Sequence, residues 1–494
     1  MIDQKIKLIT GSLLHDIGKV VYREGSDRRN HSVSGYDFLK EEGKIEDKEI
    51  LDCVRYHHFS EIKSAHLKED NLAYIVYLAD NIAAFADRRK KEDTEEKGFD
   101  LSVPLQSVFN VLNGNNQSFY YQPGDMDDQG KINYPASEKK PFSREFYMKI
   151  CQRMLDNFRG MNWSEEYLNS LLAVMEANLS YMPSSTSNEE LSDISLFDHV
   201  KLTAAISSCI YDYLNENHLS YKTELFDKKD FYDRNAFLLC SMDISGIQSF
   251  IYTISSKNAL KTLRARSFYL EIMMEHIIDF LLDRLQLSRA NLLYSGGGHC
   301  YLLLANTTET VMQIQKFQEE LKEWLLKQFQ TDLFVAFGYV QCTGNAFRNV
   351  PEGSYTELFR KMSKMLSLQK QHRYTAREII RLNNRKEQDY SRECKVCKKI
   401  GHVDEEGVCP LCRKIEKLSK NVLYADFFSV ILENPDERED AMPLPGGYCL
   451  VADDEKKLCR RMENDDYFVR SYSKNKLYTG KHIATKLWVG DYST

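Results

Sequence analysis

Histidines are concentrated near the start of this chain. Five of its 12 histidines lie within the first 66 residues. His15 and Asp16 are adjacent in the segment LLHDIGK, and His57 and His58 form a second adjacent pair. Imidazole and carboxylate groups together are typical ligands of first-row transition metals. Metal ions held in this way activate water and neutralise phosphate oxygens, which is the chemistry of phosphodiester hydrolysis.

Helices are expected to bring these side chains together. The segments SGYDFLKEEG, KEILDCVRYHHF and NLAYIVYLADNIAAFA carry apolar residues at three- and four-residue spacing. Asp80 lies in the last of them, between apolar neighbours, and His31 follows a polar loop. The alternative treats each histidine as a core or helix-end residue satisfied by hydrogen bonds, and His66, in a polar turn, is assigned to the surface. We predict a transition-metal site with the ligands His15, Asp16, His31, His57, His58 and Asp80.

A cysteine cluster predicts a second metal site. Two CxxC pairs, Cys394 with Cys397 and Cys409 with Cys412, are separated by eleven residues. Four thiolates spaced in this way can surround one Zn²⁺ tetrahedrally, and a site closed by four protein ligands is structural. Redox chemistry of a CxxC pair is the alternative. We assign the other eight of the 12 cysteines to the apolar core.

The middle of the chain predicts a ferredoxin-like domain. From residue 236 to residue 342 the pattern indicates a strand, a helix, two strands around a glycine turn, a helix and a strand. In polymerase and cyclase palms this hairpin supplies carboxylates for two metal ions, but here it reads Gly296-Gly297-Gly298-His299. Asp243 remains on the first strand. The glycines allow the backbone to approach a phosphate or nucleotide, and an ordinary tight turn is the alternative.

Composition limits the classes of protein to consider. The chain has 494 residues and a formal net charge of -7, and its length predicts about three or four domains. No run of about 18 apolar residues occurs, and the N-terminus does not read as a signal peptide. We therefore expect a cytoplasmic protein with reduced thiols and no membrane partner. Net acidity gives no general attraction to nucleic acid, so local patches or other subunits must hold such a partner.

Several sequence blocks together resemble a known family. They occur in the order LLHDIGKVVYR, YHHF, YLADNIA, LFDHVKLTAAISSCIYDYL, MDISGIQSFIY, KTLRARSFYLE, RANLLYSGGGHCYLLLANT and the paired CxxC. The chain resembles, over its whole length, the large subunit of type III-A CRISPR effector complexes. This resemblance implies a multidomain α+β protein with an all-α HD domain, a ferredoxin-like palm domain and a helical zinc-binding domain.

The resemblance also implies a division of the chain. It assigns 1–112 to a permuted HD-type phosphodiesterase domain, 113–230 to connecting loops and helices, 231–354 to a first palm with a degenerate cyclase hairpin, 355–425 to a helical domain with the zinc site, and 426–494 to a mixed tail. The tail ends on Trp488-Val-Gly-Asp-Tyr, which is typical of a strand leading into a second palm. We therefore expect the chain to be the front portion of a larger protein.

The activity implied by the resemblance is cleavage of single-stranded DNA with Mn²⁺, Ni²⁺ or Co²⁺. The HD motif falls on His15 and Asp16, and Lys19 becomes a phosphate contact. The positions of His31, His57, His58 and Asp80 resemble those of the remaining ligands. CRISPR RNA, target RNA and the other type III-A subunits are the implied partners, and the implied role is antiviral defence.

The palm is expected to supply half of an ATP site. In this family two palms bind ATP with Mg²⁺ and make cyclic oligoadenylates, using a Gly-Gly-Asp-Asp hairpin that this sequence lacks. We therefore expect no synthesis by this chain alone. Two other hypotheses stay open: a catalytically silent, zinc-stapled scaffold that binds CRISPR RNA and partner subunits, and an HD enzyme acting on nucleotides. The residues expected at the half site are Asp243, Ser245, Gly296, Gly297 and Gly298.

Overall fold

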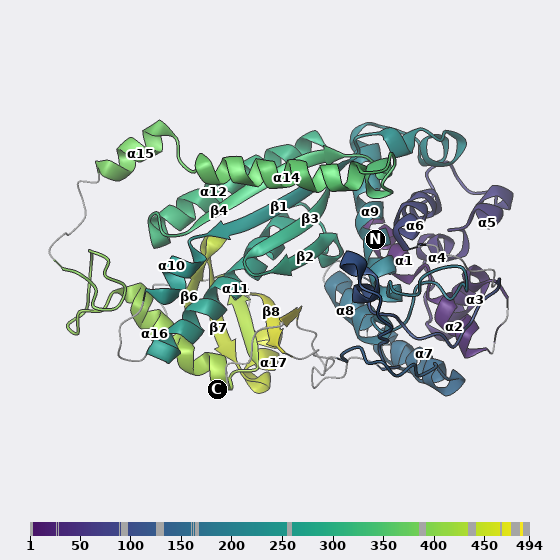
Figure 1. The fold of residues 1–494 in the computed structure, drawn as a ribbon, viewed down its shortest axis with the longest axis horizontal. Helices are drawn as coiled ribbons and strands as arrows, with labels where there is room; N and C mark the ends of the chain where they lie inside the picture. The colour runs from purple at the N-terminus through teal and green to yellow at the C-terminus, as the bar shows by residue number, and fades with distance from the viewer. Residues whose placement is uncertain are drawn as a thin grey trace.

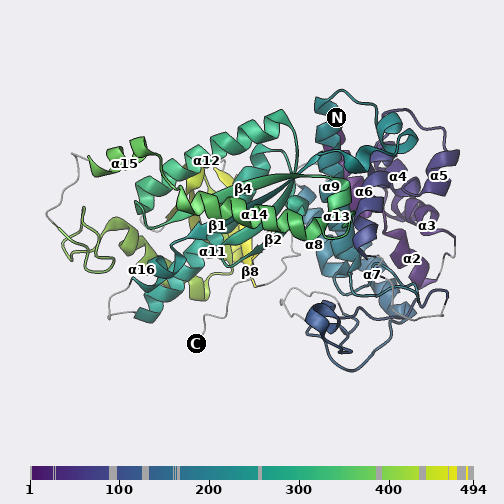
Figure 2. The ribbon, with the colours of Figure 1, turned by 45° about the horizontal axis from the view of Figure 1, so that its top comes forward.

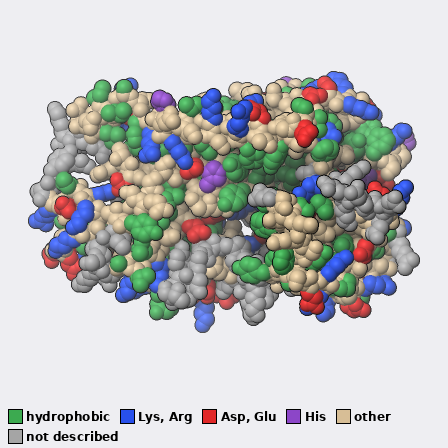
Figure 3. Space-filling model, viewed as in Figure 1, with side chains coloured by type: hydrophobic (Ala, Val, Ile, Leu, Met, Phe, Trp, Pro, Cys, Tyr) green, Lys and Arg blue, Asp and Glu red, His purple; other side chains and the backbone are tan. Residues whose placement is uncertain are grey.

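The fold comes from a computed structural model of the chain. It describes residues 3–25, 27, 29–87, 89, 97–124, 133–159, 161, 163, 167–253, 259–384, 392–432, 441–464, 467–475 and 485–487. Figure 1 shows a helical lobe built from the N-terminal part of the chain beside a lobe with two sheets. On the face of the molecule seen in Figure 3, acidic and basic side chains are interspersed. Within the described residues, none of the helices combines the length and apolar character needed to cross a bilayer.

Capped helices form the first lobe. Asp3 accepts a hydrogen bond from the backbone of Lys5 at the start of α1, and Ser195 accepts one from Asp198 at the start of α9. Helices α1, α6 and α9 pack against one another, so their apolar faces are buried together. The helices are α1 (Gln4–Leu14), α2 (Gly18–Glu24), α3 (His31–Asp37), α4 (Lys48–Arg55), α5 (Phe59–Ser64), α6 (Ala73–Asp87), α7 (Arg144–Phe158), α8 (Leu168–Leu179) and α9 (Leu196–Glu216).

Two predicted segments share one core in this lobe. Side chains from α1 and α4 are buried in the same apolar cluster as side chains from α7, α8 and α9. The expected boundary between 112 and 113 therefore separates stretches that pack together. The domain limits remain a prediction, but the second stretch contributes directly to the core of the first.

The first sheet confirms the predicted ferredoxin-like unit. Its strands are antiparallel neighbours in the order β2-β3-β1-β4, so the first and last strands of the unit lie side by side. Helices α11 and α12 cover one face, while α9 and α14 pack on the other, and α14 crosses the sheet in Figure 2. The elements are β1 (Phe237–Ser245), α10 (Ile247–Tyr252), α11 (Ala259–Arg284), β2 (Leu292–Gly296), β3 (His299–Ala305), α12 (Thr308–Phe329) and β4 (Phe334–Cys342).

The stretch predicted as a mixed tail, 426–494, contributes the strands of a second sheet. Its strands follow the order β6-β7-β5-β8-β9, and its apolar face shares a core with α11 of the first sheet. The predicted terminal strand at 488–494 lies outside the described residues. The remaining elements are α13 (Gly344–Phe347), α14 (Ser354–Gln371), α15 (Ala376–Asn383), α16 (Pro410–Tyr424), β5 (Phe427–Ile431), β6 (Met442–Leu444), β7 (Tyr448–Asp453), α17 (Glu455–Asn464), β8 (Phe468–Lys474) and β9 (Thr485–Leu487).

Candidate functional site

The buried histidines of the helical lobe are oriented by backbone carbonyls. His15 lies at the C-terminal end of α1, and its Nδ1 donates to the Ser12 carbonyl over 2.7 Å. His57 follows α4, and its Nδ1 donates to the Val54 carbonyl, also over 2.7 Å. A carbonyl only accepts, so each neutral ring keeps its proton on Nδ1 and presents the Nε2 lone pair. This tautomer suits a metal ligand, because the backbone fixes the ring from behind.

Three imidazoles form one ligand set. The nitrogens of His31, His57 and His58 lie within 4.8 Å of one another. His31 is the first residue of α3, which Asn30 caps, while His57 and His58 occupy the short connection between α4 and α5. The Nε2 atoms of His31 and His58 are 2.7 Å apart. Two separate segments of the chain therefore direct three rings toward a single point.

A second ligand set combines His15, Asp80 and His199. Its three ligand atoms also lie within 4.8 Å of one another, and all three side chains are buried. His199 Nε2 lies 3.2 Å from Asp80 Oδ1. His15 Nε2 is buried and has no hydrogen-bond partner among the described residues. A buried nitrogen lone pair beside a carboxylate fits a divalent cation, which would complete its coordination.

Asp16 lies between the two sets. Its Oδ1 is 3.2 Å from His31 Nε2 and 3.7 Å from His57 Nε2. Its Oδ2 is 3.1 Å from His199 Nε2 and 3.5 Å from His15 Nε2. One carboxylate thus offers a different oxygen to each set. This arrangement is suited to a pair of metal ions that share a ligand.

The electrostatics keep these groups in the forms that bind metal. Burial opposes ionisation of Asp16, but the Lys19 ammonium and the neighbouring histidines outweigh it and hold the pKa of Asp16 well below its usual range. Burial likewise opposes ionisation of Asp80, but its contacts to histidines lower its pKa strongly. Burial lowers the pKa of His57 well below the usual value and that of His58 to about 4. At neutral pH the site therefore offers two carboxylates together with the neutral imidazoles of His57 and His58.

Sequence reasoning missed His199. The residue lies on α9, in the stretch assigned to connecting helices, and packing of α9 against α1 and α6 carries it into the second set. Its signal was the block LFDHVKL, where a histidine is flanked by apolar residues on a helix. The six predicted ligands are all brought together, and the structure adds His199 as a seventh group. His66 is exposed, as predicted.

The candidate metal ligands open onto a cavity of about 570 Å³. Lys19 lies on its wall, with its ammonium 2.6 Å from Asp16 Oδ2. A cation at this position can meet a phosphate oxygen that enters the cavity. The other residues that line it include Tyr22, Arg23, Arg29, Ala84, Phe99, Leu101 and the loop Ser184–Ser187.

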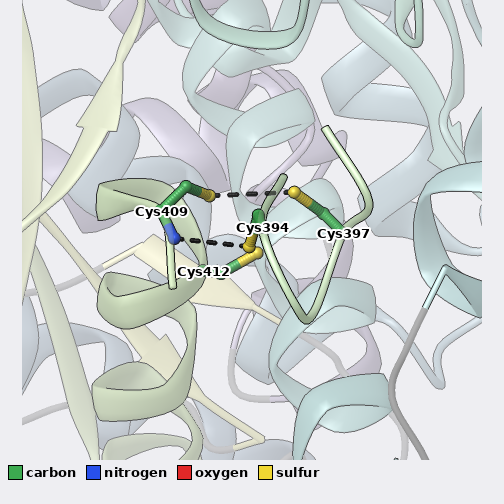
Figure 4. Close-up of side chains that lie close together, drawn as sticks. All are labelled: Cys394, Cys397, Cys409 and Cys412. Atoms are coloured by element: carbon green, nitrogen blue, oxygen red, sulfur yellow. Dashed lines mark hydrogen bonds between the residues drawn. The ribbon is translucent and has the colours of Figure 1, made fainter. Parts of the chain in front are cut away.

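The four predicted zinc ligands also meet. The four cysteine sulfurs all lie within 4.8 Å of one another. Figure 4 shows Cys394 and Cys397 on a loop facing Cys409 and Cys412 at the start of α16. Cys409 N–H donates to Cys394 Sγ over 3.3 Å, and the buried Arg266 of α11 donates to Cys412 Sγ over 3.5 Å. The cluster has the composition and compactness of a structural zinc site.

The palm hairpin brings together only part of the predicted half site. Gly297 and Gly298 both have positive φ values, 61° and 80°, so the hairpin makes a tight turn that favours glycine. With Gly296 they line a second cavity of about 250 Å³. Asp243 contacts Lys370 of α14 at 3.0 Å and His299 of the hairpin at 3.2 Å. Among the described residues that line the hairpin cavity, neither Asp243 nor Ser245 appears.

Comparison with known proteins places this chain. A family model described as HD domain matches residues 1–84, and one described as Csm1 subunit domain B matches residues 236–385. A protein of Enterococcus italicus named CRISPR system single-strand-specific deoxyribonuclease Cas10/Csm1 (subtype III-A) is 41% identical to the chain and aligns with 99% of it. The chain belongs to the Cas10/Csm1 family. A Cas10/Csm1 relative of the same name from Mycobacterium tuberculosis is 39% identical, again over 99% of the chain.

The chain spans slightly less than two thirds of these Cas10/Csm1 relatives, 66% of the first and 65% of the second. Solved structures show the same fold. A Csm1-Csm4 subcomplex of the type III-A CRISPR-Csm interference complex matches with a TM-score of 0.69 and 23% identity, over 98% of this chain and 60% of that one. A Csm1-Csm4 cassette in complex with AMPPNP matches with a TM-score of 0.70 and 24% identity, over 99% and 60%. The expected HD domain and palm-like fold are thus confirmed, while the expected domain bounds stay a prediction.

Proposed function

We propose that the helical lobe is a metal-dependent phosphodiesterase that cuts single-stranded DNA, acting in the cytoplasm within a type III-A CRISPR effector complex. The observation that carries this proposal is Asp16, whose two oxygens face two separate ligand sets. The names of the Cas10/Csm1 relatives support the choice of substrate. A hydrogen-bonded core of histidines would not need ligand atoms converging from both sides of one buried carboxylate.

The residues divide the work of such a site. His31, His57 and His58 would hold one ion, and His15, Asp80 and His199 the other, with Asp16 between them. Divalent ions bound there lower the pKa of water and neutralise charge on a phosphate. Lys19, on the cavity wall, would bind a non-bridging phosphate oxygen and orient the backbone of the strand.

The ligand chemistry indicates which metals fit. Imidazole nitrogens outnumber carboxylates in both sets, which favours Mn²⁺, Co²⁺ or Ni²⁺ over Mg²⁺ and Ca²⁺. The cysteine cluster, with four sulfurs and no open position, favours Zn²⁺. The two kinds of site should therefore be separable by chelation, since the zinc site is closed and the histidine site opens onto a cavity.

The test is a cleavage assay with the purified chain. Labelled single-stranded DNA, duplex DNA and RNA are incubated with Mn²⁺, Co²⁺, Ni²⁺ or Mg²⁺. We expect cutting of the single strand with the transition metals, and loss of at least about 100-fold in rate for the double variant His15→Ala and Asp16→Ala. Unchanged cutting by the double variant would overturn the assignment, as would a rate on small nucleotides that exceeds the rate on DNA.

A second proposed role concerns the palm. The glycine hairpin and its cavity support a half site for ATP with Mg²⁺, because Gly296–Gly298 let a phosphate approach the backbone while Lys201 supplies a nearby cation. The solved relative with AMPPNP points to the same ligand class. Asp243 pairs with Lys370 and does not line this cavity, so we assign the nucleotide to the glycines of the hairpin. Equilibrium binding of ATP, with Gly297→Val as the variant, tests this role.

Partners and the scaffold alternative can be examined together. We propose that the chain docks with a Csm4-type subunit and, through the complex, with CRISPR RNA and target RNA, as the subunits named in the solved relatives suggest. A silent scaffold would contain about one zinc per chain and no further ion. An active HD enzyme would contain about two more ions, which chelators remove first. Elemental analysis before and after chelation distinguishes the two.

A further inference from the structure

The wall of the metal cavity carries an exposed aromatic ring. Phe99 lines the cavity that contains His31 and His58, yet its side chain is 75% exposed. Exposed aromatic residues are common on protein surfaces and need no explanation when they occur alone. Phe99 differs from such residues because it lines the same cavity as the candidate metal ligands. Tyr22, on α2, lines the same cavity and is also partly exposed.

The backbone holds Phe99 in place. The Asp100 N–H donates to the Thr186 carbonyl over 2.9 Å, and the Asn188 N–H donates to the Gly98 carbonyl over 2.9 Å. Phe99 therefore sits in a short antiparallel pairing with the loop that contains Ser187. Gly98, with φ +107°, makes the turn into this pairing. Hydrogen bonds on both sides hold the backbone at Phe99 in place and leave its ring exposed, so the position from which the ring projects is set before a ligand binds.

Polar groups stand beside the ring. The loop Ser184–Ser187 lines the cavity with hydroxyl-bearing side chains, and Glu190 accepts a hydrogen bond from Ser185. Lys19 adds a cation on the same cavity. A flat apolar ring suits the face of a nucleobase, and hydroxyl groups suit its polar edges. A cation suits the phosphate of the same nucleotide.

We propose that Phe99 forms a nucleobase subsite, on which one unstacked base of a single strand lies while a neighbouring phosphate reaches the metal ligands. The position of that phosphate rests on the proposed phosphodiesterase function. The subsite gives the single-strand preference a physical cause: a base inside a duplex must leave its stack before it can meet the ring. Stacking on an aromatic ring accepts any base, so the subsite selects strand state and not sequence.

The experiment compares Phe99→Ala with Phe99→Trp and with the control Phe109→Ala. Phe109 is 58% exposed in the same part of the chain but does not line the cavity. For Phe99→Ala we expect the KM for single-stranded DNA to rise roughly tenfold with kcat little changed, since stacking contributes to binding. Phe99→Trp should keep the wild-type KM, because indole also stacks. Phe109→Ala should behave as the wild-type protein.

Abasic oligonucleotides identify the partner of the ring. A strand with single abasic positions around the cleavage site should bind the wild-type protein about tenfold more weakly at one position and should bind Phe99→Ala no more weakly there. The subsite is refuted if Phe99→Ala weakens binding equally for intact and abasic strands at every position. It is also refuted if the KM of Phe99→Ala is unchanged.

A direct binding measurement separates this idea from the proposed activity. Fluorescence anisotropy of labelled oligothymidylate is recorded with the metal-free full chain. If the wild-type protein cuts nothing, the phosphodiesterase proposal fails, but binding still decides the subsite. About tenfold weaker binding by Phe99→Ala supports it, and equal dissociation constants for the two proteins overturn it.

Discussion

His199→Ala is the change that most directly examines the second ligand set. The side chain is 2% exposed, and its Nε2 lies 3.1 Å from Asp16 and 3.2 Å from Asp80. Loss of these two charge-assisted contacts should cost the metal-free protein about 3 kcal/mol of unfolding free energy. The same change removes one imidazole from a set that keeps His15, Asp80 and one oxygen of Asp16.

The effect on metal binding can be worked out. Loss of a group that only supports a ligand weakens metal binding by about 10- to 100-fold, so loss of a ligand itself should reach about 100-fold or more. With Mn²⁺ at 100 times the wild-type Kd, binding to one site stabilises the wild-type protein by about 2.7 kcal/mol. With a Kd raised 100-fold, the same concentration equals the Kd, and the stabilisation falls to about 0.4 kcal/mol.

The assay is denaturant unfolding with and without Mn²⁺, together with elemental analysis of desalted protein. Taking the difference between the two unfolding curves removes the intrinsic cost of the substitution. His66→Ala serves as the control, because that histidine is exposed. We expect the variant to hold one ion fewer than the wild-type protein. Full metal content and full stabilisation in His199→Ala would refute the assignment of this residue as a ligand.

Three further predictions concern charge and zinc. In Lys19→Met the main attraction that lowers the pKa of Asp16 is lost, so the pKa of Asp16 in the metal-free protein should rise; an unchanged Asp16 titration curve, followed by NMR, would contradict this. Burial raises the pKa of Glu271 to about 7 from 4.5, so its ionisation penalises the fold as pH rises through this window. Glu271→Gln should therefore gain about 1 to 2 kcal/mol at pH 8 and nothing at pH 4 in urea unfolding, the figure being reduced for partial exposure, and equal gains at both pH values would argue against it. Cys397→Ser should reduce zinc from about one ion per chain to nearly none, whereas Cys151→Ser, which alters a cysteine of α7 outside the cluster, should keep it; the measurement is a colorimetric zinc assay.

Much of the architecture was readable along the chain, because the signals are local. Alternation between buried strands and amphipathic helices predicted the elements of the first sheet, and the order of those elements allows few topologies. The zinc ligands were predictable for a similar reason, since two residues between paired cysteines is a spacing that a single turn can satisfy. The glycine run likewise predicted a tight turn between two strands, and Gly297 and Gly298 make that turn with positive φ values.

The histidine centre was predictable only in part. Six of its groups are crowded into the first helices, and crowding of such residues is visible without a fold. The role of Asp16 is not visible in this way, because the direction of each carboxylate oxygen depends on how α1 packs. His199 lies far along the chain, and no local pattern distinguishes it from a histidine satisfied in a core.

The sequence by itself determined the residue types, the periods of the helices and strands, the family, and the chemistry that imidazoles, carboxylates and thiolates can perform. Tertiary structure alone decided which of these groups meet. Packing of α9 against α1 and α6 places His199 beside Asp80. Pairing of the loop at Phe99 with the loop at Ser187 places an aromatic ring on the wall of the same cavity. Both contacts join segments about 90 or more residues apart, so they depend on the burial of shared apolar faces, which no short stretch of sequence encodes.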